Sequence, residues 1–116
     1  MKDLIHHEHT LLVLKELEKN PSTTQRYLSQ ELGISLGKVN FMLNALIEKG
    51  IIEAKNFKNA KHKLAYMYLL TPHGIKTKFN LTQQFIVWKT QQYDRLKAEI
   101  DDLKIEVSSF SYKKVT

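Results

Sequence analysis

The chain of 116 residues contains no cysteine, two prolines, four glycines and one tryptophan. Because it has no thiol, disulfide bonds and thiolate metal sites are both excluded. No stretch approaches the roughly 20 apolar residues of a membrane-spanning helix, and the N-terminal MKDLIHHEHTLL is too polar for a secretory signal. We therefore expect a cytoplasmic protein that has no membrane partner.

Charge of one sign dominates the chain. The formal net charge is +6 at pH 7 and the sequence pI is about 9.5, a balance that favours polyanionic partners such as nucleic acid. Residues 35–63 hold six lysines and two glutamates, so the excess lies in the middle of the chain. The alternative is that these lysines are only a solvated surface. The 42% of hydrophobic residues is in the range of folded globular proteins. The length of 116 residues suits one small domain and an extension.

Two helices are predicted in the first part of the chain. Apolar residues at helical intervals indicate a first helix over residues 4–20, before Pro21. A second helix follows and ends at Gly33. Its candidate N-terminal caps are Ser22, paired with Gln25 in a capping box, or else Thr23 or Thr24.

A third helix is expected after the turn GIS, with Ser35 as its N-cap and Gly50 at its end. Its predicted buried stripe consists of Val39, Met42, Leu43, Leu46 and Ile47. Two short helices joined by a glycine-containing turn are typical of a helix-turn-helix motif, whose second helix can enter the DNA major groove.

A β-hairpin is predicted next. The β-branched or aromatic segments IIEAK (residues 51–55) and LAYMYLL (64–70) flank a basic tip, NFKNAKHK. The expected fold class is therefore mainly α with a small β-hairpin, a winged helix-turn-helix domain over residues 1–72.

The rest of the chain predicts one long C-terminal helix over residues 73–110, with a frayed tail at 111–116. A heptad frame places its candidate dimerisation residues on one stripe: Phe79, Ile86, Tyr93, Leu96, Ile100, Leu103 and Val107. A helix of about 30 residues is roughly 45 Å long, longer than the preceding domain. We therefore expect part of it to pack against a second copy, the alternative being packing onto its own domain.

Charge favours a parallel pair of helices, but weakly. In the parallel arrangement Glu99 faces Lys104 of the other copy, whereas the antiparallel one brings Glu99 or Glu106 near like charges. Exposed ion pairs contribute only about 0.2–1 kcal/mol.

Polar residues of the third helix lie broadly opposite its buried stripe. The candidate base-contacting residues are Ser35, Gly37, Lys38, Asn40, Phe41 and Asn44. Asparagine can pair with adenine and lysine with guanine, Phe41 can cover a thymine methyl group, and Gly37 permits a close approach. Taken singly, each asparagine could equally be an ordinary exposed residue.

Phosphate contacts are expected from two further places. At the start of the second helix the candidates are Thr23, Thr24 and Arg26, although the threonines could simply be caps. In the hairpin tip they are Lys58, Asn59, Lys61, His62 and Lys63. Such contacts position a protein on DNA without themselves reading sequence.

Metal and enzyme chemistry are weakly indicated. HHEH at residues 6–9 places His6 and His9 three apart, which could hold a metal, but N-terminal histidines are commonly solvated. There is neither a glycine-rich phosphate loop nor a nucleophile motif, and no paired carboxylates lie beside a histidine. We expect no enzyme activity, no metal and no cofactor.

With these elements placed, residues 11–70 resemble the winged helix-turn-helix domain of MarR-type transcriptional regulators, most clearly at VNFMLNALIEKGII (residues 39–52). ISLGKVNFMLNALIEKGII (34–52) with AKNFKNAKHKLAYMYLLTPHGI (54–75) is similar to a bacterial subgroup associated with exopolysaccharide gene clusters.

The resemblance implies a homodimer that binds a palindromic operator in double-stranded DNA. The base-contacting candidates above match that family's reading helix, and residues 58–63 match its wing. The chain lacks the family's longer N-terminal dimerisation helix, so we expect no small-molecule effector. Two alternatives remain: a winged helix that docks a protein partner, and a metal-responsive regulator that uses His6 and His9.

Overall fold

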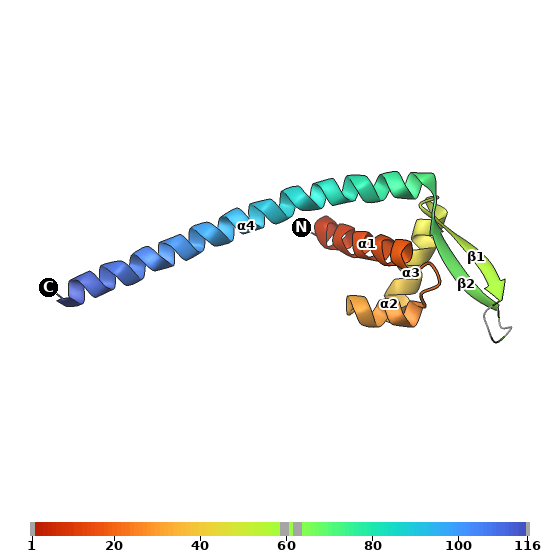
Figure 1. Cartoon of the computed structure of the whole chain (residues 1–116), viewed down its shortest axis with the longest axis horizontal. Coiled ribbons are helices and arrows are strands. Elements are labelled where there is room, and N and C mark those ends of the chain that lie inside the picture. Colours follow the sequence, from red (N-terminus) through yellow and green to blue (C-terminus); the bar gives the residue numbers. More distant parts are fainter. Residues whose placement is uncertain (1, 59–60, 62–63, 116) are drawn as a thin grey trace. The chain divides into compact units, whose positions relative to one another are not determined.

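The computed structural model describes residues 2–58, 61 and 64–115, and the side chains of residues 8–58, 61 and 65–111. It divides into two compact units, residues 1–82 and 83–116. The elements are α1 (Lys2–Lys19), α2 (Gln25–Leu32), α3 (Leu36–Glu48), β1 (Ile52–Lys58), β2 (Leu64–Leu70) and α4 (Pro72–Val115) (Figure 1). The predicted mainly α fold, with a winged helix-turn-helix, a small hairpin and a long C-terminal helix, is confirmed.

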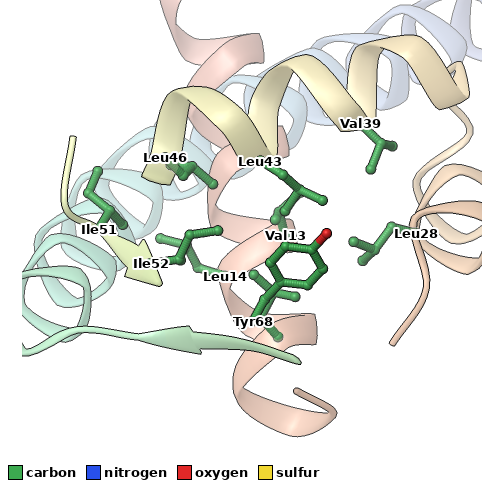
Figure 2. Close-up of a cluster of buried hydrophobic side chains, with 10 residues drawn as sticks. Val13, Leu14, Leu28, Val39, Leu43, Leu46, Ile51, Ile52 and Tyr68 are labelled. Carbon is green, nitrogen blue, oxygen red and sulfur yellow. The ribbon is translucent and has the colours of Figure 1, made fainter. Parts of the chain in front are cut away.

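The core of the first unit is built from α1, α2, α3 and both strands, as Figure 2 shows. Its fully buried side chains are Val13, Leu14, Leu17, Leu28, Val39, Leu43 and Ile52. Burying each such side chain contributes about 1.5–3 kcal/mol. On α3, the predicted stripe is confirmed at Val39, Leu43 and Leu46, and Met42 is half-buried. Ile47 is exposed, so its prediction as a core residue was wrong.

The hairpin is antiparallel and in continuous register from Ile52 opposite Leu70 to Lys58 opposite Leu64. The first strand was predicted to end at residue 55, but residues 56–58 continue it. They do so because Asn56 and Phe57 find ladder partners in Tyr66 and Ala65. The tip is therefore shorter than predicted.

Helix α4 begins with its own cap. The Gly74 N–H donates to the Thr71 hydroxyl at 3.0 Å, and Pro72 occupies the first helical position, where its missing N–H costs nothing. Lys78 pairs with Glu18 of α1 at 3.0 Å.

Helix α4 belongs partly to each unit. The first unit runs to residue 82, and Leu81 packs against its core. At the other end, the helix continues to Val115 rather than ending at residue 110. No proline or glycine occurs in residues 111–115 to stop it.

Gly74 lets the first turn of α4 lie directly on the backbone at Ile51. The Thr71 N–H donates to the Ile51 carbonyl oxygen at 3.0 Å, and a Cβ atom on Gly74 would overlap that same oxygen. A larger residue would have to push the helix away from the strand.

We expect Gly74→Ala to lower the free energy of unfolding by about 3 kcal/mol, the upper end of the range for overpacked sites. Gly37→Ala is the matched control, since a Cβ there meets open space. Alanine in place of glycine in that helix should change stability little, or raise it by up to about 1 kcal/mol. Urea unfolding followed by circular dichroism measures both. Equal effects of the two substitutions would show that the contact with Ile51 does not constrain the fold.

Candidate nucleic-acid interface

The turn between α2 and α3 has the geometry of a helix-turn-helix. Gly33 has a φ of 66°, a left-handed conformation, and its N–H donates to the Ser29 carbonyl oxygen to close α2. Ser35 then caps α3 as predicted, because its hydroxyl oxygen accepts from the Lys38 N–H at 3.1 Å. Local hydrogen bonds thus close α2 and begin α3 within a few residues.

A polar strip runs along the outer side of α3. Its members, called here the α3 strip, are the predicted base-contacting residues Ser35, Gly37, Lys38, Asn40, Phe41 and Asn44. Lys38 is half-buried and the other five are exposed. Phe41 is the most exposed of the large apolar side chains, at 74%. The strip exists because Val39, Leu43 and Leu46 turn the opposite side of the helix into the core.

The two asparagines of the strip belong to a hydrogen-bond chain. Asn44 Nδ2 donates to Asn40 Oδ1 at 3.2 Å, and Asn40 Nδ2 donates to Gln25 Oε1 at 3.2 Å. Gln25 Nε2 in turn donates to the Tyr68 hydroxyl oxygen at 3.3 Å. The roles of Gln25 and Tyr68 could not be predicted from the sequence, because the bonded pairs are separated by 15 and 43 residues and leave no periodic signal.

The structure shows which of the predicted caps begins α2. Thr24 is the N-cap, accepting from the Tyr27 N–H at 3.0 Å. Gln25 therefore does not form the predicted capping box with Ser22, whose hydroxyl donates to Asn20 instead.

Thr23 is wrongly predicted as a phosphate ligand. Its side chain is buried, with 5% exposed, and its hydroxyl oxygen has no hydrogen-bond partner among the described residues. Thr24 and Arg26 do lie exposed at this helix start. Thr24 also borders a hollow of about 310 Å³ that is lined by Gln25 and by Tyr66 and Tyr68 of β2.

In the hairpin, Lys58 and Lys61 are exposed. Asn59, His62 and Lys63, the other predicted wing residues, lie outside the described part of the structure. Tyr66 is 60% exposed on β2, and its ring stacks on the Tyr68 ring with the centroids 6.3 Å apart. The described wing residues thus offer two cations and an aromatic ring.

The described residues contain neither a candidate metal cluster nor a candidate membrane-spanning helix. No group of three or more histidine, aspartate or glutamate side chains there could hold a metal. The side chains of His6 and His7 lie outside this part, while His9 is half-buried. No helix in the described ranges is both long enough and apolar enough to cross a membrane.

The second unit carries the predicted heptad stripe on α4. The stripe residues in this unit are all exposed in the single chain: Ile86, Tyr93, Leu96, Ile100, Leu103 and Val107. Phe79, which belongs to the first unit, is also exposed. Phe110, 66% exposed, occupies the next d position of the same frame and was not among the predicted residues.

Residues 7–53 match a family model described as winged helix-turn-helix DNA-binding. This part of the chain is thus similar to a winged helix-turn-helix DNA-binding domain. The match runs from within α1 to the start of β1 and includes the whole α3 strip. A comparison with curated proteins finds no match.

Solved structures share this winged helix-turn-helix fold. A protein assigned as a transcriptional regulator in Thermoplasma acidophilum is 24% identical, with a TM-score of 0.65, over 80% of this chain and 95% of that one. The adhesin competence repressor of Streptococcus pyogenes is 18% identical, with a TM-score of 0.58, over 89% and 78%. A transcriptional regulator homologue from Pyrococcus horikoshii is 10% identical, with a TM-score of 0.57, over 78% and 94%.

Two neighbouring threonines should respond oppositely to valine. Thr23→Val removes an unpartnered buried hydroxyl at almost constant volume, so we expect the free energy of unfolding to rise by about 1 kcal/mol or more. Thr24→Val removes the cap of α2 and should lower it by about 1 kcal/mol. Thermal and urea unfolding of the two variants provide the test. A loss of stability in Thr23→Val would mean that its hydroxyl has a partner in solution.

Proposed function

We propose that this protein is a transcriptional regulator that binds double-stranded DNA sequence-specifically as a homodimer on a palindromic operator. The observation that carries the proposal is the α3 strip, which is mostly polar and mostly exposed on the second helix of the helix-turn-helix motif. In such motifs this helix lies in the major groove, where base edges are distinguishable.

Within the strip, each residue type suits a different group of the DNA. Asn40 and Asn44 are the candidates for adenine N6 and N7, and Lys38 for guanine O6 and N7. Phe41 offers an apolar surface to a thymine methyl group. Ser35 and Gly37, at the start of α3, lie where the first turn of a reading helix approaches the DNA most closely.

Phosphate contacts are proposed on both sides of α3. Thr24 and Arg26 lie exposed at the N-terminus of α2, where unpaired N–H groups and the helix dipole favour an anion. Lys58 and Lys61 are exposed in the wing. Asn59, His62 and Lys63 remain predicted wing contacts. These contacts would give affinity, and the α3 strip would give sequence preference.

A second copy of the chain is the proposed partner of the α4 stripe. Large exposed apolar surfaces mark interaction sites, and Tyr93, Leu96, Ile100, Leu103 and Val107 follow the a and d positions of a coiled coil. In the parallel arrangement Glu99 would face Lys104 of the other copy. Two domains held in this way would contact half-sites about 34–36 Å apart, or a multiple of that.

Membership of the MarR-type regulators, and control of exopolysaccharide genes, are proposals that rest on sequence resemblance. The segments that carry it, residues 34–52 and 54–75, include the α3 strip and the hairpin. The first operator to test is therefore the DNA upstream of the protein's own gene and of any adjacent exopolysaccharide cluster.

A second candidate function is favoured by one observation. Phe41 is 74% exposed in the middle of the α3 strip, and an exposed aromatic ring also suits the centre of a protein interface. In this alternative, α3 docks a protein partner and does not enter DNA. The two functions differ in salt dependence, because only phosphate binding releases condensed counterions.

We expect salt-sensitive, preferential binding to upstream DNA, measured by fluorescence anisotropy against a scrambled duplex at about 50 and 200 mM salt. Asn40→Ala should cost about 1–3 kcal/mol on the preferred duplex and little on the scrambled one. Lys61→Ala should weaken both and reduce the salt slope by about 1.

Lys15→Ala is the control for loss of a positive charge, since Lys15 is exposed on α1, outside the α3 strip and the wing. Unlike Lys61→Ala, it should leave both the affinity for the two duplexes and the salt slope unchanged. Equal losses on both duplexes for Asn40→Ala would contradict base contact by that residue. No binding at either salt, from a folded dimer, would favour the protein-docking alternative.

The dimer is tested by two aspartate substitutions on α4. Leu103 and Ile105 are similarly exposed, at 59% and 64%, but the heptad frame places Leu103 at d, in the seam, and Ile105 at f, on the outside. Leu103→Asp should dissociate the dimer and Ile105→Asp should not. Analytical ultracentrifugation of the two variants decides. Dissociation by both, or by neither, would rule out this seam.

A further inference from the structure

The hydrogen-bond chain from Asn44 to Tyr68 links three elements that proposed contacts with DNA depend on. Asn40 and Asn44 belong to α3, Gln25 begins α2, and Tyr68 lies on the wing strand β2. The three bonds join Asn44 to Asn40 at 3.2 Å, Asn40 to Gln25 at 3.2 Å and Gln25 to Tyr68 at 3.3 Å. The exposed asparagine amides that are proposed to contact bases are thus connected to the hydroxyl of a buried tyrosine.

Tyr68 is a firm anchor for this chain. It is 6% exposed, and Figure 2 shows its ring among the core side chains, with the hydroxyl pointing away from β2 toward the helices. Its backbone N–H donates to the Pro21 carbonyl oxygen at 2.9 Å, which ties β2 to the segment before α2. A buried tyrosine hydroxyl requires a hydrogen-bond partner, and Gln25 supplies one.

The internal bonds leave the asparagines able to contact a base. A primary amide has two N–H donors and an oxygen that accepts twice. Asn40 uses one donor, to Gln25, and one acceptor position, from Asn44. One donor and one acceptor position remain, which is the pair that adenine N7 and N6 require.

We infer that Gln25 is a positioning residue for base recognition, held by the buried Tyr68 hydroxyl and itself holding the Asn40 amide. The inference rests on the proposed function, because it concerns how the α3 strip reads DNA. A free asparagine side chain must be ordered when it binds, and prior ordering removes that cost. The same bonds tie the reading helix to the wing strand, so base and backbone contacts share one support.

The first test uses the protein without DNA. In ¹⁵N spectra, Tyr68→Phe and Gln25→Met should both shift the Asn40 side-chain amide signals, because each breaks the chain at nearly constant volume. Tyr66→Phe is the matched control, since this tyrosine lies two residues away on the same strand and its hydroxyl is not part of the chain. Asn40 signals unchanged in Tyr68→Phe would overturn the inference whatever the protein binds.

The second test measures sequence preference. The wild-type protein first selects a duplex from a pool with a randomised centre. The affinity for the selected duplex is then compared with the affinities for a set of duplexes, each changed at one adenine. Tyr68→Phe should reduce the preference for the selected base at the position contacted by Asn40 by about three- to tenfold. The affinity for a scrambled duplex and the salt slope should not change. Tyr68 is too buried to touch DNA, so this loss cannot come from a contact of its own.

Rescue separates positioning from a structural defect. The carboxylate of Gln25→Glu can still accept from Asn40 and from the Tyr68 hydroxyl. Gln25→Glu should therefore keep the base preference, while its negative charge lowers the affinity for all duplexes. Gln25→Met should show neither effect: it should lose the preference and should not lower the affinity for all duplexes. Unchanged preference in folded Tyr68→Phe would overturn the inference. If the wild-type protein selects no sequence, the proposed function fails and the role in base recognition fails with it, whereas shifted Asn40 signals would still establish the hydrogen-bond chain.

Discussion

The packing of α3 across the hydrophobic core is the constraint on which the rest of the first unit depends. Val39 and Leu43 are fully buried in one cluster with Leu28 of α2 and Leu14 of α1. Once that side of α3 faces inward, about 100° of rotation per residue directs Asn40, Phe41 and Asn44 outward. The composition of the exposed side is then free of the demands of folding and available for recognition.

The second unit obeys a different constraint. Its part of α4 has apolar side chains on a regular stripe, and residues from Tyr93 to Val107 are all exposed in the single chain. A helix of this kind gains little from its own domain, because tertiary burial of an apolar face is the main source of helix stability in proteins. Burial against a second copy would supply what the single chain does not.

Polar groups within the first unit connect the buried core with the proposed recognition surface. Gln25 satisfies the buried Tyr68 hydroxyl on one side and the exposed Asn40 amide on the other. Thr24 caps the N-terminus of α2 and is exposed, whereas Thr23, one residue earlier, is turned into the core. These two threonines thus have opposite surroundings, because successive side chains in the short loop before α2 point to opposite sides.

Much of this protein was determined by local sequence. Capping by Ser35, termination at Gly33 and the period of the α3 stripe act between near neighbours, so their outcome follows from residue order alone. Other features were decided only by tertiary structure. The burial of Thr23, the exposure of Ile47, the length of β1 and the link from Gln25 to Tyr68 depend on which surfaces meet. Such meetings join residues far apart in the chain, and no local pattern encodes them.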